Sequence, residues 1–175
     1  LGTLDKPDEG KVWLDDVELS RLKGNELASY RNKNVGFIFQ FHNLLPEFSA
    51  LENVCIPAYL SGRKSDQEII KRGKELLALL GLEQRMEHKP SQLSGGEQQR
   101  TAVARALMNN PSVVFADEPS GNLDSHTADE LHRLFFKLRD EMNQTFVIVT
   151  HNEELADMAD EKLEIKDGVL LNGAL

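Results

Sequence analysis

The 175-residue chain is 40% hydrophobic and 28% charged, which provides enough apolar material for one folded domain, with or without a small inserted subdomain. Its 20 basic and 29 acidic residues give a net charge of −9, which argues against nucleic acid as a partner. No apolar stretch approaches the roughly 20 residues that span a bilayer, and the single cysteine, Cys55, excludes an internal disulfide.

The first half of the chain predicts two strands and a helical insert. Residues 11–15 alternate in hydropathy like a half-exposed strand, and residues 35–39 form an apolar run typical of a strand buried on both faces. Residues 41–93 contain no such run, so we expect a helical insert there. Within it, residues 65–80 predict a helix that opens on an S-x-x-E capping box and stops at Gly81. The side chains expected to face a core are Ile69, Ile70, Leu76, Leu77 and Leu80.

The second half alternates strands with helices. Residues 113–116 and 146–149 are apolar runs of the same buried kind. Residues 163–165 and 169–171 predict a terminal hairpin around Asp167-Gly168. Because helical patterns separate the buried runs, the chain is predicted to be α/β with a largely parallel sheet. The helix over residues 125–142 is expected to place on one face Ala128, Leu131, Leu134, Phe135 and Leu138.

The sequence LSGGEQQR, residues 93–100, places two adjacent glycines at the start of a predicted helix. Each glycine costs about 1 kcal/mol relative to alanine inside a helix. One explanation is that Ser94 and Glu97 form a capping box that tolerates the glycines. The other is that a helix N-terminus without side chains lets a phosphate approach bare N–H groups and the positive end of the helix dipole.

Polar residues follow the carboxyl end of each buried run: Gln40, the pair Asp117 and Glu118, and His151. In parallel sheets, ligands bind at this end of the strands. Asp117 can hold Mg²⁺ through water, and Glu118, which points elsewhere along an extended chain, can act as a general base. Taken singly, each residue also has an ordinary explanation, as a loop amide, an acidic loop edge or a histidine at a strand end. Asp124 likewise suits the N-cap of the next helix.

Taken together and in this order, the motifs closely resemble those of the ATP-binding subunits of ABC transporters, from Leu1 to about residue 172. The resemblance implies a P-loop NTPase fold with a RecA-like core, in a single nucleotide-binding domain over residues 1–175. Residues 1–40 and 94–175 would form the catalytic core with a small β flank, and residues 41–93 a helical subdomain. The implied cofactors are ATP and Mg²⁺.

The resemblance also implies roles for the residues at the strand ends. Gln40 is similar to the Q-loop glutamine, which touches the metal and faces the membrane subunits. Asp117 resembles the Walker B aspartate that serves the metal. Glu118 resembles the catalytic glutamate, and His151 the switch histidine that contacts the γ-phosphate. These positions define the expected catalytic and metal site.

The remaining motif residues imply a partner copy of the same chain. Ser94, Gly95, Gly96 and Glu97 look like the ABC signature, which binds ATP held by the opposite subunit of a head-to-tail dimer. Asp124 resembles the D-loop aspartate. The other implied partners are membrane permease subunits, which would place the protein peripherally at the cytoplasmic face of the inner membrane.

The family also uses a Walker A loop, G-x-x-x-x-G-K-[ST], which this sequence does not contain: Gly10-Lys11 is followed by Val12, and Gly73-Lys74 by Glu75. In the family, LGTLDKPDEGKV follows that loop. We therefore expect an N-terminally incomplete fold, with the loop either missing from the protein or placed ahead of Leu1. Without it, the chain alone is expected to be inactive.

Two stretches narrow the resemblance to the ATPase of bacterial lipoprotein-releasing complexes: FQFHNLLPEFSALENV at residues 39–54 and FADEPSGNLDS at residues 115–125. Alternatives are the ATPases of macrolide-export or cell-division complexes, and a non-catalytic interaction module. A DNA-repair or chromosome-structuring ATPase shares a similar signature. That class inserts very long coiled coils, whereas residues 41–93 carry no sustained heptads.

Overall fold

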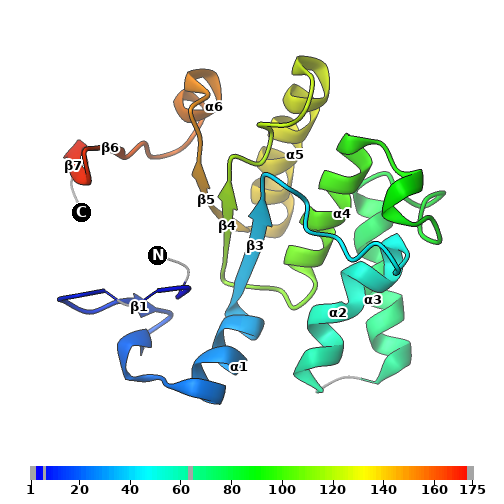
Figure 1. The fold of residues 1–175 in the computed structure, drawn as a ribbon, viewed down its shortest axis with the longest axis horizontal. Coiled ribbons are helices and arrows are strands. Elements are labelled where there is room, and N and C mark those ends of the chain that lie inside the picture. Colours follow the sequence, from blue (N-terminus) through cyan, green and yellow to red (C-terminus); the bar gives the residue numbers. More distant parts are fainter. Residues whose placement is uncertain (1–2, 6, 63–64, 173–175) are drawn as a thin grey trace.

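The computed structural model describes residues 3–5, 7–62 and 65–172 and centres them on a three-stranded sheet (Figure 1). Its strands are β3 (Val35–Phe39), β4 (Val113–Asp117) and β5 (Thr145–Val149). They pair in the order β3-β4-β5, and both pairings are parallel. The three predicted strands and their parallel arrangement are therefore confirmed, with β4 and β5 each one residue longer than predicted.

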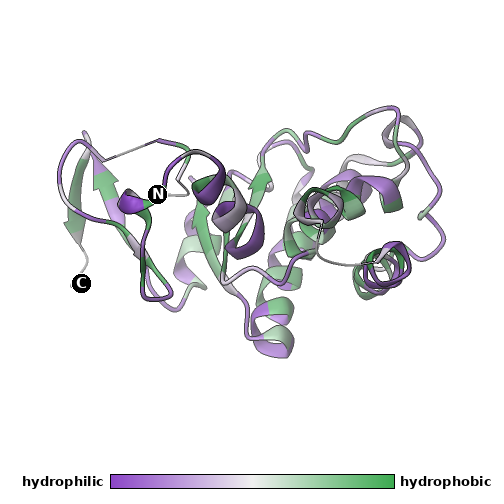
Figure 2. Cartoon of the chain, turned by 90° about the horizontal axis from the view of Figure 1, so that it is seen from below, coloured by the Kyte–Doolittle hydropathy of each residue, from purple (hydrophilic) through white to green (hydrophobic). Residues whose placement is uncertain are grey.

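One face of this sheet carries the main apolar core. Ile38, Val114 and Ala116 are buried in one cluster with side chains of α4 (Gly95–Leu107) and α5 (Ser125–Met142). Helix α5 has the predicted bounds, and its buried apolar side chains are Leu131, Phe135 and Leu138. Figure 2 shows the strands coloured as hydrophobic along most of their length. Burial of this face is the main apolar contribution to stability.

On the opposite face of the sheet, Val35 and Val113 are buried, but the other strand residues are half-buried or exposed. Phe37, Phe39 and Phe115 lie on it and stack, with ring centroids 5.9 Å apart for Phe37–Phe39 and 6.1 Å for Phe37–Phe115. The prediction of strands buried on both faces is therefore confirmed only at the start of β3 and β4, because α4 and α5 both pack on the face of Ile38 and Val114. Stacking of these rings contributes to the packing of the half-buried part of this face.

The segment expected to be a helical insert contains α2 (Ala50–Ser61), α3 (Asp66–Leu79) and the 3-10 turn η2 (Pro90–Gln92). Ser65 caps α3 in a capping box, and Gly81 follows it at φ +71°, as predicted. Ile69 is buried, whereas Ile70 is 38% exposed, so the prediction for Ile70 is wrong. Successive helical residues are separated by about 100°, which turns Ile70 out of the core. The assignment of residues 41–93 to a separate subdomain stays a prediction.

Small elements flank this core. The predicted strand at residues 11–15 is shorter in the structure and pairs with its neighbour in an antiparallel hairpin. The predicted terminal hairpin is confirmed, with Asp167 and Gly168 both at positive φ in its turn. No helix among residues 3–5, 7–62 and 65–172 is long and apolar enough to cross a membrane. These elements are β1 (Trp13–Leu14), β2 (Val17–Glu18), η1 (Leu19–Arg21), α1 (Gly24–Asn34), α6 (Glu153–Asp157), β6 (Glu164–Lys166) and β7 (Val169–Asn172).

Candidate functional site

The carboxyl edge of the sheet gathers the polar residues predicted at the strand ends. Gln40 directly follows β3, Asp117 is the last residue of β4, and His151 lies two residues beyond β5. The register pairs Phe39 with Asp117 and Asp117 with Val149, so the three strand ends are level. Asp117 is exposed there. A ligand at this edge would meet side chains from all three strands.

Glu118 leaves β4 by a sharp change of backbone direction. Its φ is +42°, and its N–H donates to the carbonyl of Val149 at 2.9 Å. This backbone is left-handed, so the expectation of an extended chain at Glu118 is wrong. A non-glycine residue held at positive φ costs of the order of 1–3 kcal/mol and is often found at functional sites.

The Glu118 carboxylate is partly enclosed and incompletely satisfied. Its side chain is 22% exposed, and Oε1 lies 3.5 Å from Nε2 of His151, whose side chain is 99% exposed. Oε1 is itself buried and accepts no hydrogen bond from the described residues. A buried carboxylate oxygen without a hydrogen-bond donor is an unsatisfied acceptor. A general base toward water needs a carboxylate oxygen that can still accept a hydrogen bond, and Oε1 meets this requirement.

The turn after Glu118 contributes residues that the sequence did not single out. Asn122 exchanges two hydrogen bonds with Gln40, which lies 82 positions earlier in the chain. Ser120 Oγ lies 2.8 Å from Nε2 of His132, a buried residue of α5. Burial lowers the pKa of His132, partly offset by Asp129 and Glu154. In the sequence, the only indication that His132 is buried was its position next to Leu131, which belongs to the predicted apolar face of α5.

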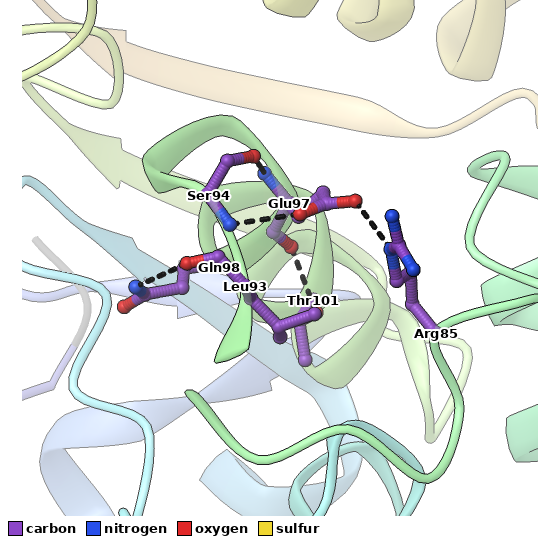
Figure 3. A network of polar contacts seen from close by, with 6 residues as sticks. All are labelled: Arg85, Leu93, Ser94, Glu97, Gln98 and Thr101. Carbon is purple, nitrogen blue, oxygen red and sulfur yellow. Dashed lines mark hydrogen bonds and ion pairs between the residues drawn. The ribbon is translucent and has the colours of Figure 1, made fainter. Parts of the chain in front are cut away.

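The signature sequence forms a closed network at the start of α4 (Figure 3). Ser94 Oγ accepts from the Glu97 N–H at 3.2 Å, and Glu97 Oε2 accepts from the Ser94 N–H at 2.8 Å. The predicted capping box is thus confirmed. Arg85 Nε donates to Glu97 Oε1 at 2.8 Å. The Arg85 hydrogen bond, followed by that from the Ser94 backbone, lowers the pKa of Glu97 to about 2.

The two signature glycines have different surroundings. Gly96 is buried, and a Cβ there would lie 2.5 Å from Cγ2 of Thr127. Gly95 is exposed, and a Cβ there would meet only Leu123 Cδ2, at 3.6 Å. Gly96 therefore lets α4 pack against the start of α5, whereas Gly95 leaves the helix N-terminus open. The hypothesis that a glycine leaves room for a phosphate therefore applies to Gly95. The glycine at position 96 is explained by close packing within the chain.

Asp124 holds the start of α5 in place beside these glycines. Its carboxylate accepts from the Thr127 N–H at 3.1 Å and from Thr127 Oγ1 at 2.7 Å. Both bonds, the one from Oγ1 first, lower the pKa of Asp124. The ordinary explanation of Asp124 as an N-cap is therefore confirmed. Its role as a D-loop residue stays a prediction.

The donor set at the sheet edge fits Mg²⁺ held mainly by a nucleotide. Among the described residues, no group of three His, Cys, Asp or Glu side chains is placed to bind a metal ion by itself. Mg²⁺ is usually bound through one or two carboxylates together with substrate phosphates and water. The Asp117 carboxylate and the Gln40 amide oxygen are oxygen donors at neighbouring strand ends. Together they suit a metal that arrives with its phosphates.

Replacing Gly96 by alanine should destabilise the fold by about 1 kcal/mol, because the new methyl group meets Thr127 Cγ2 and overpacking costs about 1–3 kcal/mol, partly offset by better helix propensity. Thr127→Ser removes Cγ2 and keeps the hydroxyl that bonds Asp124. We therefore expect Thr127→Ser to recover most of the loss in the Gly96→Ala background. Urea unfolding of the four proteins measures this, and a loss unaffected by Thr127→Ser would contradict it.

Replacing Glu97 by glutamine should change how stability depends on pH. The folded-state pKa of Glu97 is lowered from 4.5 to about 2, so its stabilising effect is full above pH 4.5 and is lost as the pH falls toward 2. Glutamine keeps the acceptor of the capping box but does not titrate. The difference in unfolding free energy between the two proteins should therefore shrink below pH 4.5. Parallel profiles in urea unfolding would show that the Arg85 contact contributes nothing.

Comparison with known proteins identifies the class. Residues 1–121 match the family model described as "ABC transporter". The chain belongs to this family, and it is an ABC-type ATPase subunit with a P-loop NTPase fold.

Individual relatives agree with this assignment. The chain is 59% identical over 171 residues to the lipoprotein-releasing system ATP-binding protein LolD of Cytophaga hutchinsonii, covering 98% of this chain and 78% of the relative. It is 57% identical over 170 residues to LolD of Bacteroides thetaiotaomicron, covering 97% and 78%. Among solved structures, the ATP-binding cassette MJ0796 in a dimeric post-hydrolysis state with ADP and Pi has a TM-score of 0.86 at 42% identity, covering 98% of this chain and 75% of that one.

Proposed function

We propose that this protein hydrolyses ATP to drive a bacterial ABC transporter that releases lipoproteins from the inner membrane. The observation that carries the hydrolytic part is the placing of Gln40, Asp117, Glu118 and His151 at one edge of the sheet. The lipoprotein substrate is supported by identity to LolD proteins over nearly the whole chain. The permease would largely select the substrate, and this chain would supply the energy by hydrolysing ATP.

In the proposed mechanism Oε1 of Glu118, which accepts no hydrogen bond from the described residues, takes a proton from the attacking water. His151 lies beside that carboxylate and is fully exposed, and it would contact the γ-phosphate. Asp117 and Gln40 would hold Mg²⁺, which when bound neutralises charge on the phosphates. Because Glu118 and His151 follow neighbouring strands at the same edge of the sheet, one bound γ-phosphate would lie within reach of both side chains.

The proposed assembly is a head-to-tail dimer docked on permease subunits at the cytoplasmic face of the inner membrane. Ser94 and Gly95 are exposed at the start of α4, where a nucleotide on a second copy can approach the helix N-terminus. A dimeric structure of the related cassette MJ0796 supports this arrangement. Phe41, Leu45 and Phe48, directly after Gln40, are large exposed hydrophobic residues suited to a permease surface.

Reconstitution with the permease tests the proposal. The intact protein and its permease are placed in liposomes that carry a fluorescent lipoprotein, and release to a soluble acceptor is followed. We expect release with ATP, none with ADP, and none with the Glu118→Gln variant. ATP hydrolysis that accompanies no release would contradict the lipoprotein assignment and favour a macrolide-export or cell-division complex.

A further inference from the structure

We propose that Asn122 is a positioning residue that determines which end of the Gln40 side-chain amide is available to a metal ion. The inference rests on the proposed function, in which Gln40 is a ligand of Mg²⁺. Asn122 lies on the turn between Glu118 and α5, and it contacts no reacting group itself. Its effect would pass through Gln40.

The orientation of Asn122 is fixed by a group that can only accept a hydrogen bond. Its Nδ2 donates to the main-chain carbonyl of Gln40 at 3.1 Å. A carbonyl oxygen has no proton to donate, so the amino end of Asn122 must face it. The Oδ1 end of Asn122 is then available to the Gln40 side chain, and it accepts from Gln40 Nε2 at 3.3 Å.

This pair leaves the oxygen of Gln40 as the free end of its amide. The nitrogen end of the Gln40 amide faces Asn122, and Gln40 Oε1 accepts no hydrogen bond from Asn122. Mg²⁺ binds oxygen ligands, whereas an amide turned the other way would present two N–H donors to the cation. The Asn122 contact therefore selects the orientation of Gln40 that can ligate.

The turn that carries Asn122 is itself held in place. The Gly121 N–H donates to the Glu118 carbonyl at 3.0 Å, and Ser120 is tied to the buried His132. A Cβ at position 121 would lie 2.9 Å from Gln40 Nε2, so glycine is what allows the turn to approach the amide this closely. Asn122 thus sits on a fixed support rather than on a free loop.

A first experiment tests the contact without nucleotide or metal. Hydrogen exchange of the Gln40 side-chain amide is measured by NMR in the intact protein and in the Asn122→Ala variant, with the exposed Gln67 amide as the reference. We expect exchange at Gln40 to be slower than at Gln67, and to approach the Gln67 rate in the variant. Equal rates at Gln40 in both proteins would overturn the proposal.

A double-mutant cycle tests the consequence for the metal. Binding of Mn²⁺ with ATP, followed by EPR, is measured for the intact protein, Asn122→Ala, Gln40→Glu and the double variant. Asn122→Ala should weaken metal binding about tenfold, the lower end of the 10–100-fold loss typical when a residue behind a ligand is removed. A carboxylate offers oxygen at both ends, so Asn122→Ala should have little effect in the Gln40→Glu background.

The outcomes separate the two hypotheses. An equal loss in both backgrounds would mean that Asn122 acts only on the fold, and would overturn the positioning role while leaving the proposed function in place. Metal binding that is unchanged by Gln40→Glu and by Asn122→Ala would instead remove Gln40 from the metal site, and with it this part of the proposed function. A loss of metal binding on Asn122→Ala that occurs with Gln40 present, and not with Gln40→Glu, supports the proposal.

Discussion

Replacing Glu118 by glutamine in the intact protein should lower ATP turnover by about 10²–10⁴-fold, the usual contribution of a general base, and should leave ATP bound in a stable dimer. Glutamine has nearly the shape of glutamate but cannot take a proton from water. The buried Oε1 without a donor is the atom that this substitution disables. The nucleotide would still close the dimer, because the signature residues of the second copy are unchanged.

Phosphate release and light scattering in the presence of ATP and Mg²⁺ measure these two effects. Glu83→Gln is the matched control, because Glu83 is an exposed glutamate outside the sheet edge. It should leave turnover and the monomer–dimer balance unchanged. Near-normal turnover of Glu118→Gln would contradict the assignment of Glu118 as the base.

Replacing Gly95 by aspartate should abolish ATP-driven dimerisation while leaving the fold intact. Gly95 is exposed and has only one ordinary contact within reach of a new Cβ, so the substitution does not overpack the chain. An acidic side chain in the first turn also favours the helix itself. At the proposed interface, however, its charge would face the phosphates of the nucleotide on the other copy.

The same substitution at Gly96 would not be informative, because its Cβ would collide with Thr127 inside the chain. Gly95→Asn serves as the matched control, since asparagine has nearly the same size without the charge. We expect light scattering with ATP to show dimers for Gly95→Asn, at reduced affinity, and monomers for Gly95→Asp. Thermal unfolding checks that both variants remain folded. If Gly95→Asp dimerises at the same ATP concentration as the unaltered protein, repulsion between its carboxylate and the nucleotide phosphates is excluded.

Much of the fold could be predicted from local patterns. The apolar runs predicted the three central strands and their parallel arrangement but not their order in the sheet, and the 3.6-residue period predicted α5 with its buried face. The S-x-x-E sequences gave the capping boxes of α3 and α4. Helix α1 could not be predicted from an apolar stripe, because it buries no residue. Ile70 was misplaced because it lies about 100° around α3 from the buried Ile69 and falls outside the buried face.

The site was predictable in its residues but not in its contacts. The order of motifs along the chain pointed to Gln40, Asp117, Glu118 and His151, whereas the backbone at Glu118 departs from an extended strand. The Asn122 contact with Gln40 joins segments 82 positions apart. The different surroundings of Gly95 and Gly96 depend on α5, which local sequence does not reveal.

The central claim is that each catalytic site is shared between two copies of the chain, with Glu118 from one copy and the signature of the other. The most direct measurement mixes the Gly95→Asp and Glu118→Gln proteins and follows phosphate release in a single turnover. Each variant alone should be inactive, but a mixed dimer contains one site with an intact Glu118 and an intact signature. The predicted result is phosphate release that appears on mixing. As the control, the double variant is mixed with the unaltered protein, and no release should remain there after correction for unaltered dimers. No release on mixing, although mixed dimers form, would contradict a shared site.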